Sequence, residues 1–235
     1  MFVISLAGVR IGIDNRYPFI ERQCRAFLCE GEAEFVVSAS PDDILEESKH
    51  GEFSDAYCES ICLYRRICEK IADYNVFLMH SSIVEVDGFA YAFCAKSGVG
   101  KSTHTRLWIK NIPNARVLNG DKPLLKLEDD GSVTAYGTPW NGKENWGENI
   151  SAPLRAVCFL ERGAENSIRR LDTVESYYNL SSQIARPYYD TRPGDKLLDF
   201  TERLLDTVPI YCLTCNISTE AVETVVREIF PQEDI

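Results

Sequence analysis

The glycine-rich segment Ala95–Thr103 constrains this chain more than any other part of its sequence. It reads Ala-Lys-Ser-Gly-Val-Gly-Lys-Ser-Thr and follows the apolar run 89–95, which favours a buried strand. Residues 103–110 can begin a helix, and the N-terminal amides of a helix bind anions. A strand, a glycine-rich loop and a helix in this order are typical of a segment that binds the phosphates of a nucleoside triphosphate.

The residues of this segment have separate expected roles. Gly98 and Gly100 permit a tight backbone path whose N–H groups turn toward phosphate oxygens. Lys101 is expected to reach the β- and γ-phosphates, and the Ser102 hydroxyl is expected to hold Mg²⁺. The predicted nucleotide-binding residues are Ser97, Gly98, Val99, Gly100, Lys101, Ser102 and Thr103.

One residue departs from the usual form of such a loop, G-x-x-x-x-G-K-[ST]. Ala95 stands where the first glycine is usual, although a small residue there still permits close packing. The alternative interpretation is a glycine-rich turn that simply precedes a helix.

The composition is that of a globular protein and limits its partners. The chain has 235 residues, of which 45% are hydrophobic and 26% charged, enough for one large domain or a domain with a small appendage. Its net charge of −11 repels polyanions, so we expect neither a nucleic-acid partner nor an anionic membrane surface. No apolar run approaches the ~18 residues that cross a bilayer. The apolar start Met1–Arg10 favours a strand over a signal peptide, so we expect a cytoplasmic protein.

Nine cysteines are many for a chain of this length, and their odd number fits no closed disulfide framework. We therefore expect reduced thiols. Cys212 and Cys215 have the C-x-x-C spacing of redox or zinc sites, but no second close pair accompanies them. We expect them to be core residues of a strand.

The pattern divides the chain into a small β-rich segment, residues 1–49, and a larger domain, residues 50–235. Strands are expected at 2–13 and 33–38 within the first part, followed by a short acidic segment from Pro41. Apolar residues at helical spacing predict an amphipathic helix over 53–74.

Two short strands are expected just before the glycine-rich segment. They cover 76–80 and 82–87, and Asp87-Gly88 predicts a hairpin turn into the strand 89–95. This arrangement would place His80 on a strand beside the phosphate-binding loop. Further strands are expected at 115–118, 124–127, 133–136, 154–160 and 210–214, with a hairpin within 115–136, and helices near 171–184, 196–205 and 220–230.

The residues around the loop resemble a known family. His80-Ser-Ser-Ile-Val-Glu-Val-Asp-Gly88, an apolar strand and Ser97-Gly-Val-Gly-Lys-Ser102 resemble the catalytic domain of HPr kinase/phosphorylase. The loop also resembles that of ATP-type phosphoenolpyruvate carboxykinases, which use S-G-x-G-K-[ST]-T. Segments that resemble small HPr-kinase-like proteins in particular are Thr103–Trp108, Asn119–Leu125 and Tyr136–Trp140.

The resemblance covers residues 76–230 in pattern and is specific only over 80–143. Nothing in residues 1–49 resembles the regulatory domain of the full-length bifunctional enzyme. The resemblance implies an α/β P-loop domain of the HPr kinase/phosphoenolpyruvate carboxykinase type with a mixed sheet. Together with the small N-terminal β-rich segment, this is the fold class that we expect.

Three residues outside the loop are candidate catalytic groups. Asp121 follows an apolar strand and would share Mg²⁺ with Ser102, although related kinases carry two adjacent aspartates where this chain has Gly120-Asp121. His80 matches the family's histidine and would orient the substrate hydroxyl or accept its proton. Lys143 would neutralise charge on the transferring group. The alternatives are an aspartate in a turn, a structural histidine and a solvated lysine.

Other residues near these segments are weaker candidates. Arg162 and Arg186 end a strand and a helix, and most such arginines are surface residues. Trp140 and Trp146 would line an acceptor pocket or anchor their loop, and His104 is expected to pack or to neighbour phosphate.

These features together predict an enzyme that uses ATP and Mg²⁺ to phosphorylate a hydroxyl group. In this hypothesis His80, Lys101, Asp121 and Lys143 are catalytic, and Ser102 and Asp121 hold the metal. The acceptor would be a serine of a protein or peptide, or a small metabolite. The alternatives are a phosphoenolpyruvate carboxykinase-like enzyme and an ATP-binding module without turnover, and the oligomeric state stays open.

Overall fold

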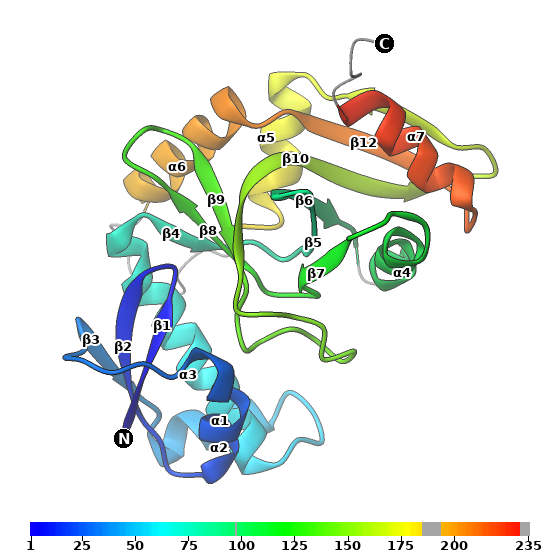
Figure 1. Ribbon diagram of the computed structural model, residues 1–235. Helices are drawn as coiled ribbons and strands as arrows, with labels where there is room; N and C mark the ends of the chain where they lie inside the picture. The colour runs from blue at the N-terminus through cyan, green and yellow to red at the C-terminus, as the bar shows by residue number, and fades with distance from the viewer. Residues whose placement is uncertain (97, 185–193, 231–235) are drawn as a thin grey trace.

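The chain folds into a nine-stranded mixed sheet and a separate three-stranded sheet, with helices around both. The structure is a computed structural model that describes residues 1–96, 98–184 and 194–230 (Figure 1). An α/β fold with a mixed sheet and a small N-terminal sheet is therefore confirmed. The large sheet consists of β4 (Val76–Leu78), β5 (Ser82–Val86), β6 (Phe89–Cys94), β7 (Arg116–Asn119), β8 (Leu124–Leu127), β9 (Val133–Tyr136), β10 (Ser151–Arg162), β11 (Ser167–Arg170) and β12 (Ile210–Cys215).

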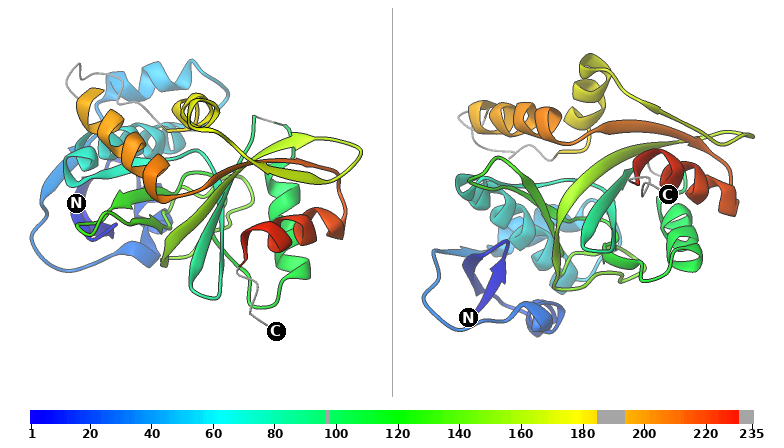
Figure 2. Two further views of the ribbon diagram at one scale, coloured as in Figure 1. Left: turned by 90° about the horizontal axis from the view of Figure 1, so that it is seen from above. Right: turned by 45° about the horizontal axis from the view of Figure 1, so that its top comes forward.

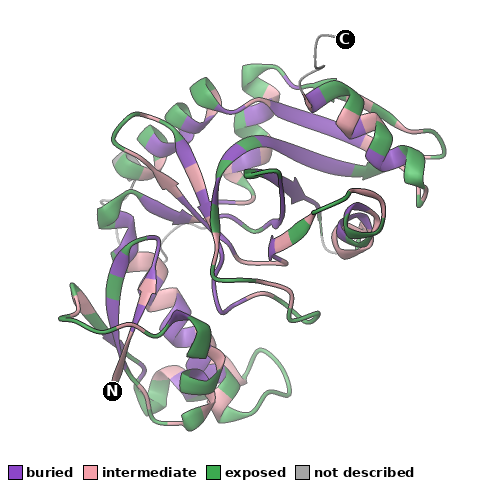
Figure 3. Ribbon diagram, viewed as in Figure 1, coloured by how far each residue is buried: buried purple, intermediate pink, exposed green. Residues whose placement is uncertain are grey.

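The long strand β10 organises the large sheet. Its first residues pair with β9 in antiparallel fashion, and its later residues pair in parallel with β6 on one side and β12 on the other. Residues 156–160 are all buried, as Figure 3 shows along this strand. Because β6 and β10 run parallel, their carboxyl ends at Cys94 and Arg162 lie at the same edge of the sheet.

Strands β5 and β6 form the predicted hairpin. Asp87 and Gly88 both have positive φ, 49° and 85°, which is the backbone of a tight two-residue turn whose twist matches the strands. Alternate residues of β6 enter different cores: Tyr91 and Phe93 lie on one face, and Ala92 lies on the other. The hairpin thus places the glycine-rich loop at the end of a strand whose residues after Phe89 are all buried.

Two pairs of helices complete the two cores of the large sheet (Figure 2). Trp108 of α4 (Lys101–Asn111) is fully buried against Tyr91 and Phe93, and α7 (Thr219–Ile229) packs beside α4. The other core contains residues of α5 (Thr173–Ser181) and α6 (Gly194–Thr207), the predicted helices near 171–184 and 196–205.

The N-terminal part is less purely β than predicted. The expected strand 2–13 is instead a hairpin of β1 (Phe2–Leu6) and β2 (Val9–Asp14), because Ala7 and Gly8 form a turn with positive φ. The third strand is β3 (Phe35–Ser38). Helical segments in this part are α1 (Pro18–Gln23), η1 (Arg25–Phe27) and α2 (Pro41–Ser48), the last of which is the expected acidic segment.

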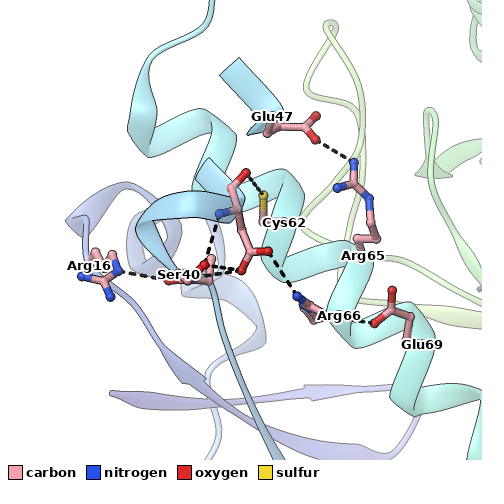
Figure 4. Close-up of polar contacts among 9 residues, drawn as sticks. Arg16, Ser40, Glu47, Cys62, Arg65, Arg66 and Glu69 are labelled. Atoms are coloured by element: carbon pink, nitrogen blue, oxygen red, sulfur yellow. Dashed lines mark hydrogen bonds and ion pairs between the residues drawn. The ribbon is translucent and has the colours of Figure 1, made fainter. Parts of the chain in front are cut away.

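Helix α3 (Asp55–Ile71) is the predicted amphipathic helix, and it packs on the small sheet. Its residues Leu63 and Ile67 are fully buried in one core with Ile4 and Ile11. Figure 4 shows ion pairs that join it to α2, from Arg65 to Glu47 at 2.7 Å and from Arg66 to Asp43 at 3.2 Å. Helix α3 begins after residue 49 but shares this core with the strands that precede that residue. The division of the chain at residue 49 stays a prediction.

Three local expectations differ from the structure. Strand β7 pairs with β5, so the hairpin within 115–136 is limited to β8 and β9. His80 lies just after β4 rather than on a strand. Strand β11, which pairs with β12, was not expected because its sequence Ser-Ile-Arg-Arg is exposed and polar. None of the nine cysteines forms a disulfide, and Cys212 and Cys215 lie in β12 as expected. Among the described helices none has the length and apolarity that crossing a membrane requires.

Trp140 connects helix α3, which packs on the small sheet, to the segment that follows strand β9 of the large sheet. Its ring is 4% exposed and stacks on Tyr64 of α3 at a centroid distance of 4.0 Å. Its indole N–H lies within hydrogen-bond distance of the Ser60 hydroxyl, at 2.9 Å, and of the Ser60 carbonyl oxygen, at 3.2 Å. Trp140 therefore fixes the segment that follows β9 against α3.

We expect Trp140→Phe to lower the free energy of unfolding by about 2 kcal/mol, because it removes a buried hydrogen bond and leaves the Ser60 hydroxyl oxygen without the indole donor. Urea unfolding followed by circular dichroism measures this change. The matched control is Trp146→Phe, whose half-buried ring lies near Arg106 and whose loss should cost less than about 1 kcal/mol. Equal stability of the wild type and Trp140→Phe would contradict the anchoring role.

Candidate functional site

A cavity of about 910 Å³ opens where the glycine-rich loop meets the N-terminal part of the chain. It is lined by the loop and the start of α4, by residues 120–122 and 139–145, and by side chains of α1 and α3. The predicted site residues that line it are His80, Gly98, Gly100, Lys101, Ser102, Thr103, Asp121 and Lys143. Val99 is not among the lining residues, and Ser97 lies outside the described residues, as does Arg186.

The glycine-rich loop has a backbone that only glycine adopts easily. Gly98 has a φ of 80° and Gly100 a φ of 131°, both in the region that disfavours other residues. The Gly100 carbonyl accepts the His104 N–H at 2.9 Å, so α4 begins immediately after the second glycine. The sequence therefore encodes a sharp path from β6 into the first turn of α4.

Arg162 holds this loop from the end of β10. Its guanidinium donates to the Gly98 carbonyl and, at 3.0 Å, to the Val99 carbonyl. Both peptide groups are thereby fixed in orientation. The sequence carries only a weak signal for this role of Arg162, namely its place at the end of a predicted strand. Arg162 reaches the loop because β6 and β10 pair in parallel, and no local sequence pattern encodes that pairing.

Asp121 is the centre of a three-residue cluster at the loop. Its Oδ1 accepts a hydrogen bond from Lys101 Nζ at 3.3 Å and lies 3.1 Å from His80 Nε2. Its backbone position is fixed by the buried Asn119, whose side-chain oxygen accepts the Asp121 and Lys122 N–H groups at 2.8 Å each. The structure therefore brings together three residues predicted to be catalytic, from three different segments.

The cluster holds Asp121 in its ionised form. Burial by itself raises the pKa of this carboxyl, but the hydrogen bond with His80 and the charge of Lys101 outweigh that effect and lower the pKa to about 2. An ionised carboxylate has no proton to donate, so His80 Nε2 must carry the hydrogen of their shared bond. In the neutral imidazole the free lone pair is then on Nδ1.

Gly120 explains why the chain has a single aspartate here. A Cβ at this position would lie 2.8 Å from the Asn141 carbonyl oxygen and 3.2 Å from that of Trp146. A carboxylate side chain at residue 120 would therefore collide with the backbone of Asn141 and Trp146.

Lys143 lines the cavity from the exposed segment after Trp140. This segment approaches Asp121 closely, because a Cβ on the preceding Gly142 would lie 2.9 Å from the Asp121 Cβ. His104, in contrast, is a packing residue. It is 3% exposed, accepts the Trp108 indole N–H at 2.9 Å, and its pKa is lowered to about 4 by burial.

The donor groups fit a metal that arrives with a nucleotide. Among the described residues no cluster of three or more His, Cys, Asp or Glu side chains can hold a metal ion. Asp121 and Ser102 both line the cavity, and the hydrogen bonds of Asp121 with His80 and Lys101 are both to Oδ1. One carboxylate and one hydroxyl are a sufficient protein contribution for Mg²⁺, which keeps phosphate and water ligands.

Sequence reasoning missed the part of the lining that comes from α1 and α3. Phe19 and Arg22 of α1, and Tyr57 and Ile61 of α3, line the cavity. Nothing in the six residues of α1 signals a site, because its role depends on how it packs against α3.

Comparisons with known proteins do not identify a family. No family model and no curated protein matches the chain. Among solved structures, the HPr(Ser) kinase/phosphatase from Coxiella burnetii matches with 14% sequence identity, covering 64% of this chain and 93% of that chain, at a TM-score of 0.39. A TM-score this low does not decide the function of the chain, so the family resemblance stays an expectation.

The charge cluster makes a titration prediction. In Lys101→Met the Asp121 carboxyl loses a cation, so its pKa should rise from about 2 toward the ordinary 3.8. Because the wild-type pKa lies below the ordinary one, the carboxylate stabilises the fold above about pH 4, and this contribution is lost as the pH falls toward 2. Carboxyl-carbon NMR measures the titration directly. Lys110→Met, an exposed change on the same helix, is the control, and an unchanged Asp121 titration in Lys101→Met would refute the contact.

Proposed function

We propose that this protein is an ATP-dependent phosphotransferase that uses Mg²⁺ and moves the γ-phosphoryl group of ATP to a hydroxyl group. The observation that carries the proposal is the Lys101–Asp121–His80 cluster at the end of a glycine-rich loop that enters a helix. A cation for phosphate, an anion for the metal and a proton acceptor are the groups that phosphoryl transfer requires.

In this proposal the triphosphate lies along residues 97–103. The backbone amides at the start of α4 bind phosphate oxygens, and Lys101 moves from Asp121 to the β- and γ-phosphates. Arg162 supports this role because it fixes the Gly98 and Val99 carbonyls before any ligand binds. Ser102 and Asp121 would hold Mg²⁺, which when bound neutralises phosphate charge and orients the γ-phosphoryl group.

The transfer step uses His80 as the proton acceptor. The acceptor oxygen forms a bond to the γ-phosphorus while the bond from that phosphorus to the bridging β,γ oxygen breaks, and ADP leaves with the electron pair. The hydroxyl proton passes to His80 Nδ1, the lone pair left free by the bond to Asp121. Lys143 would neutralise charge on the transferring group. Asp121 positions His80, so a second aspartate at residue 120 is unnecessary in this scheme.

Two alternatives remain from the sequence. A phosphoenolpyruvate carboxykinase-like enzyme would form phosphoenolpyruvate from oxaloacetate and ATP. A binding module would take up ATP without releasing ADP, and Ala95 and the single Asp121 favour it. Measurements of ADP release and of phosphoenolpyruvate formation distinguish both alternatives from the proposal.

The binding prediction concerns Lys101. We expect Lys101→Met to weaken the affinity for MgATP by ~10–100-fold, because a charged hydrogen bond to phosphate contributes ~1.5–3 kcal/mol. Isothermal titration calorimetry with Mg²⁺ and a nonhydrolysable ATP analogue measures it, and Lys110→Met should bind like the wild type. No uptake of nucleotide by the folded wild type would end the proposal.

The turnover prediction concerns His80. We expect His80→Gln to bind MgATP normally but to release ADP ~10²–10⁴-fold more slowly, because it keeps a hydrogen bond to Asp121 and loses the proton acceptor. ADP release is measured with a panel of hydroxyl compounds and seryl peptides, with His50→Gln, in the exposed segment after α2, as the control. Wild-type binding without ADP release in every case would favour the binding module, and phosphoenolpyruvate formed from oxaloacetate would favour the carboxykinase.

A further inference from the structure

The cavity has a second side that the phosphate site does not use. It consists of Phe19 and Arg22 from α1 and Tyr57 and Ile61 from α3, here called the α1–α3 wall. We propose that this wall binds the acceptor, and that the acceptor carries an aromatic group and an anionic group besides its hydroxyl. The proposal rests on the proposed phosphotransferase function.

Hydrogen bonds fix the wall next to the reacting groups. Gln23 of α1 donates to the Pro139 carbonyl at 3.1 Å, and Tyr64 of α3 donates to the Lys122 carbonyl at 2.8 Å. Lys122 follows Asp121 directly, so the wall and the Asp121 cluster are joined by one short backbone segment. His80 and the α1–α3 wall line the same cavity, so a compound whose hydroxyl reaches His80 can also contact the wall.

The wall is anchored before any ligand binds. Glu59 of α3 is fully buried, and its carboxylate accepts the N–H groups of Arg16 at 2.5 Å and Tyr17 at 3.0 Å, just before α1. Ser60 donates to the Gln23 side chain at 2.7 Å. Since α1 is only six residues long, these contacts rather than its own hydrogen bonds hold it in place.

The apolar part of the wall is an aromatic cluster open to solvent. Tyr57 is 40% exposed and lies between Phe19, at a centroid distance of 6.4 Å, and Phe53, at 5.2 Å. Ile61 adds an aliphatic surface to the lining. Aromatic side chains gathered at a cavity suit an aromatic ligand, which packs on ring faces and edges.

The charge of the wall comes from Arg22. This guanidinium is exposed in the cavity and has no ion pair among the described residues, whereas Lys101 is balanced by Asp121. Because the net charge of −11 disfavours anions over the molecule as a whole, a cation at this position selects locally for an anionic group. A guanidinium binds two oxygens of one anion at once. A cavity of about 910 Å³ has room for a nucleotide and a small second compound.

The test uses three matched probes on the full chain saturated with Mg²⁺ and a nonhydrolysable ATP analogue. 3-Phenyllactate has the hydroxyl, the ring and the carboxylate; 3-phenyllactamide lacks the charge; lactate lacks the ring. We expect 3-phenyllactate to bind at least ~10-fold more tightly than either, by ligand-observed NMR titration. Equal binding of the three probes overturns the proposal.

Variants assign the preference to the wall. Arg22→Gln should abolish the difference between 3-phenyllactate and its amide, and Phe19→Ala should abolish the difference from lactate. Arg25→Gln, an exposed change in η1 that does not line the cavity, should alter neither. If folded Arg22→Gln still binds 3-phenyllactate more tightly than 3-phenyllactamide, the proposal is overturned.

The adenine ring is the rival occupant. If Phe19→Ala weakens binding of the ATP analogue ~10-fold but leaves inorganic tripolyphosphate binding unchanged, the wall holds the base and the proposal is wrong. If the wild type binds no nucleotide, the proposed phosphotransferase function fails. The same three probes are then titrated without nucleotide, where an Arg22-dependent preference supports the wall and its absence overturns it.

Discussion

The Asp121 carboxylate, half-buried between a lysine and a histidine, is the interaction on which the site depends. Burial of a charged carboxylate is unfavourable, and here it is offset by the Lys101 ammonium at 3.3 Å and the His80 imidazole at 3.1 Å. This arrangement keeps the anion ionised, sets the proton of His80 on Nε2 and holds Lys101 at the start of α4. His80 and Asp121 are therefore oriented toward each other before a ligand arrives, and such preorganisation is a condition for strong electrostatic stabilisation of developing charge.

The rest of the fold positions this cluster from several directions. The parallel pairing of β6 and β10 brings the glycine-rich loop and Arg162 to one edge of the sheet. Asn119 at the end of β7 fixes the backbone of Asp121. Trp140 holds the neighbouring loop against α3, and residues of α1 and α3 line the cavity beside that loop. Packing of the two parts thus forms a cavity that neither lines alone.

Local sequence patterns predicted the elements around the glycine-rich loop. The contacts that they did not predict join residues far apart in the chain. The strand, loop and helix around Gly98 and Gly100, and the Asp87-Gly88 turn, follow from neighbouring residues. The contact of Arg162 with the loop, the pairing of β7 with β5 and the contribution of α1 join residues that are far apart in sequence, so periodicity gave no sign of them. The contact between His80 and Asp121 was not predicted, because the sequence patterns and the family resemblance gave the two residues separate roles near the phosphates.

The central claim is that a triphosphate binds across the amides that start α4. The most direct measurement is an amide ¹H–¹⁵N NMR titration of the folded chain with Mg²⁺ and a nonhydrolysable ATP analogue. Shifts that saturate at the amides of Gly98, Gly100, Lys101 and Ser102, while those of α7 stay in place, are the predicted result. A saturating nucleotide concentration that moves none of these four amides would contradict the account.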